Sequence, residues 1–188
     1  MNTLPQAHPM SRLGTGKVAL FIILASESVF FATLLVAYAA LRNQNNWPMD
    51  HSLGRLNFPL LNTAILILSA IPARNAILSI RAEKQPALQI SIIATLIIGL
   101  IFVAGQIYEF SHAGFHINDQ AFGGVFFTLM GFHALHVLAG AVFLVINLIR
   151  ARLGDFSSND YSPIELSSWF WYYVTAVWLV LFAALYLL

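Results

Sequence analysis

Five long apolar stretches dominate the sequence, and short polar segments separate them. The stretches cover residues 17–41, 57–80, 87–110, 121–149 and 166–188. Each is long enough to cross a bilayer as an α-helix, which needs about 20 mostly apolar residues. The pattern therefore predicts an all-α fold: one membrane domain over residues 1–188, built as a polytopic bundle of five transmembrane helices after a tail at residues 1–16.

The second stretch is the weakest of the five. Pro72 interrupts it, and Arg74 lies near its end. An arginine at that depth must extend its guanidinium to the lipid headgroups. We still predict a crossing here, because the segments on either side of the stretch require one.

The charges outside the apolar stretches predict the orientation. In a chain with five crossings, the N-terminal tail shares one side with the connections that follow the second and fourth helices. That side carries seven basic residues: Arg12, Lys17, Arg74, Arg81, Lys84, Arg150 and Arg152. The other side carries only Arg42 and Arg55. Because basic residues gather on the cytoplasmic side, we predict a cytoplasmic N-terminus and a C-terminus on the outer side.

Several residues near the predicted helix ends suit the membrane interface. Trp47, Trp169 and Trp171 are expected at the level of the headgroups, where tryptophan is enriched. Glu109 and Glu165 fall at the ends of the third and fifth helices, and we interpret both as interfacial anchors. Four basic residues are candidates to hold anionic lipid headgroups: Arg74, Arg81, Arg150 and Arg152.

Composition narrows the possible functions. Hydrophobic residues make up 59% of the chain and charged residues only 9%, far fewer than in a soluble domain. Nine basic and eight acidic residues leave no basic field that would attract nucleic acid. The chain has no cysteine, which excludes disulfides, iron–sulfur clusters and metal centres built on thiolates.

Glu27 is the clearest ionisable residue inside a predicted helix. It lies roughly 15 Å from the inner end of the first helix. A charge buried there costs about 2.5–3.5 kcal/mol, so the carboxyl needs a partner or a role. It could handle protons or bind a partner subunit, or it could be a protonated acid that hydrogen-bonds to a neighbouring helix.

His133 and His136 lie three residues apart on the predicted fourth helix and therefore share a face. Both fall near mid-membrane, at a depth similar to that of Glu27, and could meet it across the bundle. A bis-histidine haem needs ligands on facing helices or on opposite sides of the ring, which one helix cannot supply. We favour a structural or hydrogen-bonding role, and we predict no metal site and no catalytic residue in this chain.

Five sequence motifs, in the order in which they occur here, are typical of one protein family. They are ASESVFF (25–31), PLLNTAILILSA (59–70), GQIYEF (105–110), FGGVFFTLMGFHALHVLAG (122–140) and WFWYYVTAVWLVLFAALY (169–186). Together they resemble subunit III of the haem–copper terminal oxidases, in its short five-helix form. The resemblance implies that Glu27 is the family's carbodiimide-reactive carboxyl, that His133 and His136 are its two motif histidines, and that Glu109 and Glu165 are its flanking acids.

The resemblance also implies a function. Subunit III of a cytochrome c oxidase or quinol oxidase is a non-catalytic accessory subunit in a bacterial plasma membrane. It carries no haem or copper, which belong to partner subunits. It packs on subunit I, binds phospholipid between its helices and supports proton uptake and the stability of oxygen reduction. Subunit II and a small subunit IV or another respiratory complex are further implied partners.

The last helix departs from the family pattern. The family usually has W-H-x-x-D-x-x-W, whereas this chain has Tyr172 at the histidine position and Thr175 at the aspartate position. Trp171 and Trp178 are kept. Any role of that titratable pair should therefore not be transferred to this chain.

Other readings remain open. A subunit III-like protein of a nitric oxide reductase would share the same motifs. A small transporter could use Glu27 and the two histidines as a proton relay, although five helices in one copy provide no inverted repeat. A haem b membrane anchor would show its own Soret absorption.

Overall fold

The computed structural model describes residues 10–42, 57–112, 117 and 120–187, most of which lie in five α-helices. They are α1 (Met10–Arg42), α2 (Asn57–Arg81), α3 (Gln85–Ser111), α4 (Gln120–Leu153) and α5 (Ser162–Phe182), and a π-helical turn, Ala183–Leu187, follows α5. All five are long and apolar enough to cross a membrane. The predicted all-α bundle with five transmembrane helices is therefore confirmed.

The helix ends differ from the predicted ones where polar residues join a helix. The first helix begins at Met10, inside the predicted tail. The last begins at Ser162, with Pro163 in its first turn, where the missing N–H costs nothing. The fourth runs on to Leu153, because Arg150 and Arg152 suit the negative end of the helix dipole.

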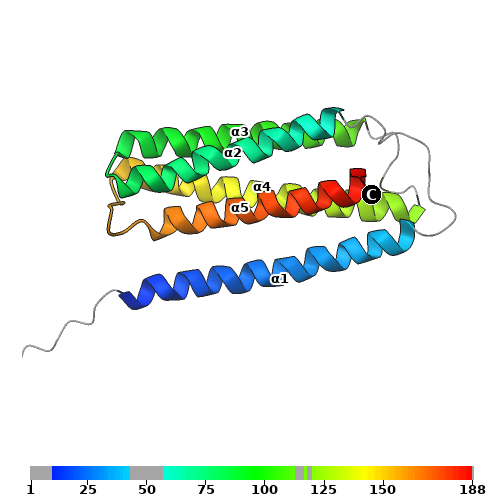
Figure 1. Ribbon diagram of the computed structural model, residues 1–188, viewed down its shortest axis with the longest axis horizontal. Helices are drawn as coiled ribbons and strands as arrows, with labels where there is room; N and C mark the ends of the chain where they lie inside the picture. The colour runs from blue at the N-terminus through cyan, green and yellow to red at the C-terminus, as the bar shows by residue number, and fades with distance from the viewer. Residues whose placement is uncertain (1–9, 43–56, 113–116, 118–119, 188) are drawn as a thin grey trace, which may run out of the picture.

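Helices α2, α3, α4 and α5 form the body of the bundle, and α1 lies along one side of it (Figure 1). The most extensive contact between two helices is that of α2 with α3, which run antiparallel. Pro72 does not interrupt α2, which continues as one helix from Asn57 to Arg81. On the other side, α1 contacts α4 and α5, yet it buries few side chains, among them Phe31 and Tyr38. The α2–α3 and α4–α5 connections lie at one end of the bundle, which we call the Arg81 end. We call the opposite end, where α1 ends, the Arg42 end.

Two tryptophans of α5 fix the core. The indole N–H of Trp171 donates to Oγ of Ser69 at 2.8 Å, and that of Trp178 donates to Oγ1 of Thr63 at 2.9 Å. Both indoles are fully buried. Each tryptophan thus joins α5 to α2 through a satisfied hydrogen bond inside a large apolar contact.

The interfacial prediction for the tryptophans is wrong for Trp171. Because α5 begins at Ser162, Trp171 lies more than two turns inside the helix, at 1% exposure. Trp169 is 41% exposed near the Arg81 end. Trp47 lies outside the described residues.

Candidate functional site

The deep acid and one of the two histidines meet between α1 and α4. Oε2 of Glu27 lies 3.1 Å from Nε2 of His136. The other ring nitrogen, Nδ1, lies 2.7 Å from the carbonyl oxygen of Phe132, which can only accept, so Nδ1 carries a proton. Nε2 is then protonated only in the imidazolium form. A hydrogen bond between Oε2 and Nε2 therefore requires a proton on the carboxyl or on the ring.

Hydroxyl and aromatic groups surround this pair. Beside it, Oγ of Ser28 donates to the hydroxyl of Tyr173 at 3.2 Å, which links α1 to α5. The ring of Phe31 lies edge-on to His136, with centroids 5.2 Å apart. The side chain of Glu27 is 33% exposed, so the pair lies at the edge of the bundle rather than at its centre.

His133 does not meet Glu27. It is fully buried, and its ring lies edge-on to Phe102 and tilted against Trp178, with centroid distances of 5.9 and 5.0 Å. Neither ring nitrogen has a hydrogen-bond partner among the described residues. The two histidines therefore point in different directions: His136 faces α1, and His133 faces the interior between α3, α4 and α5.

Polar contacts also hold both ends of α1. At the Arg81 end, Nζ of Lys17 lies 2.8 Å from Oε2 of Glu165 and 5.3 Å from the ring centroid of Trp169. At the other end, Arg42 donates to the carbonyl oxygen of Ala184 at 3.5 Å. Together with the central pair and the Ser28–Tyr173 hydrogen bond, these contacts link α1 to the rest of the bundle.

Glu165 and Glu109 each contact a side chain from another part of the bundle. The first turn of α5 contains Glu165, whose side chain is 14% exposed in its ion pair with Lys17. Glu109 accepts a hydrogen bond from the hydroxyl of Tyr186, which the π-helical turn presents to α3. The second carboxyl oxygen of Glu109 is buried without a partner in the described part of the chain.

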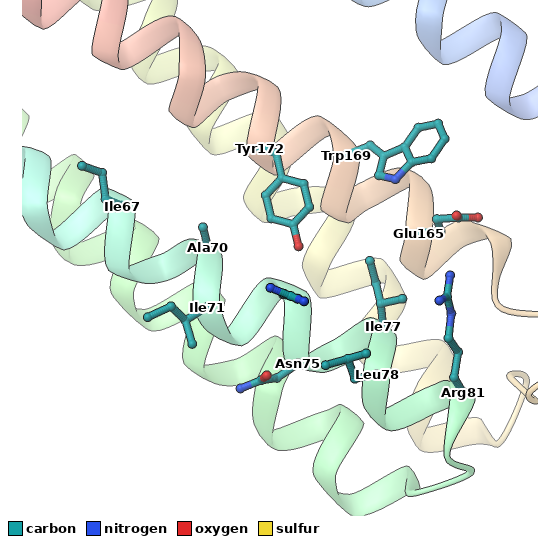
Figure 2. Close-up of a pocket in the computed structure, with 11 residues that line it drawn as sticks. Ile67, Ala70, Ile71, Asn75, Ile77, Leu78, Arg81, Glu165, Trp169 and Tyr172 are labelled. Atoms are coloured by element: carbon teal, nitrogen blue, oxygen red, sulfur yellow. The ribbon is translucent and has the colours of Figure 1, made fainter.

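A groove of about 830 Å³ lies between α2 and α5 near the Arg81 end (Figure 2). Its lining includes Ile67, Ile71, Arg74, Arg81, Trp169 and Tyr172. Figure 2 shows the phenol of Tyr172 extending from α5 toward α2. Tyr172, which the resemblance places where the family usually has a histidine, is one of the residues that line this groove.

The four candidate headgroup arginines fall into two groups. Arg74 and Arg81 line the groove, and the guanidinium of Arg81 also lies over the ring of Tyr161. Arg150 pairs with Asp155 at 3.3 Å, and Arg152 is exposed on α4. Of the four arginines, only the two of α2 therefore line the groove.

Two tyrosines of the site were not identified from the sequence. Tyr173 and Tyr186 look like ordinary residues of an apolar helix. The usable signal is that a buried tyrosine hydroxyl nearly always finds a hydrogen-bond partner. Over the described ranges, His, Cys, Asp and Glu side chains form no group of three or more that could hold a metal.

Comparison with known proteins gives one consistent result. The family model described as cytochrome c oxidase subunit III matches residues 4–188. A "Probable cytochrome c oxidase subunit 3" of Nocardia farcinica is 33% identical over 186 residues, which cover 96% of this chain and 92% of that protein. A "Cytochrome c oxidase subunit 3" of Heterololigo bleekeri is 34% identical over 178 residues, 90% of this chain and 69% of that protein.

A third relative extends the comparison to another bacterium. A "Probable cytochrome c oxidase subunit 3" of Rickettsia prowazekii is 28% identical over 189 residues, 92% of this chain and 68% of that protein. The chain thus spans nearly all of the Nocardia relative and about two thirds of the other two. Together with its five membrane-spanning helices, these matches show that the chain belongs to the cytochrome c oxidase subunit III family.

Proposed function

We propose that this chain is a non-catalytic accessory subunit of a haem–copper terminal oxidase. In such a complex it packs mainly on subunit I, with subunit II and a small subunit IV or another respiratory complex as further partners. Haem and copper would lie in those partner subunits. The role of this chain is to support proton uptake and to prolong the active life of the complex.

The match of the family model over residues 4–188 carries this proposal. The geometry supports it, because the Glu27–His136 pair lies at the partly exposed edge of the bundle, where a neighbouring subunit could contact it. The apolar faces of α3 and α4 are also widely exposed, as a partner or lipid surface would be.

We also propose a bacterial plasma membrane as the location and a cytoplasmic Arg81 end. The fold supports the orientation, because it brings Lys17, Arg81 and Arg150 to one end of the bundle, as the positive-inside rule requires.

Oxidase prepared with and without this chain tests the proposed role. We expect the two preparations to show the same haem content and nearly the same initial rate of oxygen consumption. The preparation without the chain should lose activity several times faster during continuous turnover. Loss of haem, or equal lifetimes of the two preparations, would contradict an accessory role in sustaining turnover.

We further propose that the α2–α5 groove binds an anionic phospholipid. Arg74 lies two turns, roughly 10 Å, before the end of α2, and it forms no ion pair among the described residues. Glu165, the acid in the groove lining, is already paired with Lys17. A lipid phosphate would neutralise the remaining positive charge, and Ile67 and Ile71 would contact an acyl chain.

Substitution of Arg74 tests this lipid site. Arg74→Gln should lower the amount of phosphatidylglycerol that stays bound in a native mass spectrum of the complex. A basic residue near an anionic lipid contributes about 1 kcal/mol to the binding free energy, so its removal should weaken lipid binding roughly fivefold. Arg152→Gln is the matched control, because Arg152 lies on α4 outside the groove. Equal lipid retention in all three proteins would count against the site.

A further inference from the structure

Five polar side-chain atoms are buried without a hydrogen-bond partner in one half of the described bundle. They are Nε2 and Oε1 of Gln106, Oε2 of Glu109, and Nδ1 and Nε2 of His133. Both Gln106 and His133 are fully buried. A buried polar atom without a partner costs free energy comparable to a lost hydrogen bond, so five of them in one region require an explanation.

Helix geometry brings these residues together. Phe102, Gln106 and Glu109 follow one another at spacings of four and three, so they share a face of α3. The ring of Phe102 contacts His133 of α4. Gln106 is therefore about one turn, ~6 Å, beyond the level of His133, and Glu109 follows within another turn.

Three nearby polar side chains already have hydrogen-bond partners. The indole N–H of Trp178, whose ring packs on His133, donates to Thr63. The amide of Asn62 donates to the carbonyl oxygen of Phe102 at 3.2 Å. On the far side, the hydroxyl of Tyr186 donates to Glu109.

We propose that ordered water molecules occupy an internal site between α3, α4 and α5 and join Gln106 to Glu109 and His133. A buried water typically makes about three hydrogen bonds, so two or three waters would satisfy the five atoms. The π-helical turn contributes to this site because it presents Tyr186 to Glu109. The site goes beyond the proposed function, since it requires neither the lipid nor the central Glu27–His136 pair.

Such a site has a chemical consequence. An acid, an amide and an imidazole joined by water form a connected set of hydrogen-bond donors and acceptors inside an apolar bundle. A proton on Glu109 or His133 can then move between the two side chains along the bridging waters, although the side chains do not contact each other.

Electron cryomicroscopy of the purified complex, at a resolution that shows water, tests the proposal. The wild-type map should contain water density within hydrogen-bond distance of the Gln106 amide and of Glu109 or His133. In Gln106→Leu, which removes the amide at similar side-chain size, that density should disappear. Ile107→Leu changes an exposed neighbour on α3 and should leave the density unchanged.

The wild-type map decides the question even if the Gln106 variant fails to assemble. A map in which the Gln106 amide bonds directly to Glu109 or His133, with no water between them, would overturn the proposal. Radiolytic labelling gives a second measurement, because radicals form next to bound water. Tyr186 and His133 should be modified, whereas the buried and hydrogen-bonded Trp171 should not. Absence of labelling at both sites would also contradict the hydrated site.

Discussion

Replacement of Gly99 with alanine should destabilise the chain by about 1–3 kcal/mol, because it overpacks the core. A Cβ atom at this position would lie 2.6 Å from Cζ2 of Trp171. The indole cannot easily move away, since it is 1% exposed and hydrogen-bonded to Ser69. In thermal unfolding of the detergent-purified chain, we expect the Tm to fall by about 5 °C.

Gly131→Ala is the matched control for this prediction. A Cβ atom at Gly131 of α4 meets nothing within 4 Å. Alanine is the better helix former by about 1 kcal/mol, so the Tm should stay the same or rise. An equal fall in Tm in the two variants would show that the contact with Trp171 does not cause the destabilisation by Gly99→Ala.

Replacement of Glu27 with alanine should leave the chain in the complex but shorten sustained turnover. The variant removes the carboxyl that contacts His136 and with it a polar contact between α1 and α4. We expect the rate constant of inactivation during oxygen consumption to rise several-fold. His136→Leu should act in the same way, and the double variant should decay no faster than either single variant, because the two residues act as a pair.

Ser26→Ala provides the control for the Glu27 prediction. Ser26 is an exposed neighbour, and among the described residues its hydroxyl donates only to the carbonyl oxygen of Ile22 in its own helix. Its replacement should leave the lifetime of the complex unchanged. The same acceleration in Ser26→Ala, or additive effects of Glu27→Ala and His136→Leu, would show that the pair has no special role.

The five helices could be predicted from the sequence because hydropathy alone determines which segments can cross a bilayer. Even Pro72 does not stop α2. Helix starts were harder to predict, because a first turn such as that of α5 contains polar residues and a proline that an apolar window leaves out. This explains the error for Trp171: the apolar stretch begins at residue 166, close to Trp171, whereas α5 begins four residues earlier, at Ser162.

The site could be predicted only in part. The depth of Glu27 indicated a partner at the level of the two histidines, and His136 is that partner. Spacing could not separate His136 from His133, since residues three apart share a face but differ in direction by about 60°. That difference turns His136 toward α1 and His133 toward Phe102 and Trp178. The groove and the contact of Glu109 with Tyr186 depend on how α2, α3 and α5 pack, which no local pattern encodes.

Affinity purification of the tagged chain in mild detergent tests the central claim most directly. The account predicts that a larger subunit with a haem Soret band purifies with the chain and that a native mass spectrum shows both in one complex. A colourless, homogeneous preparation of this chain alone, free of haem proteins, would contradict it.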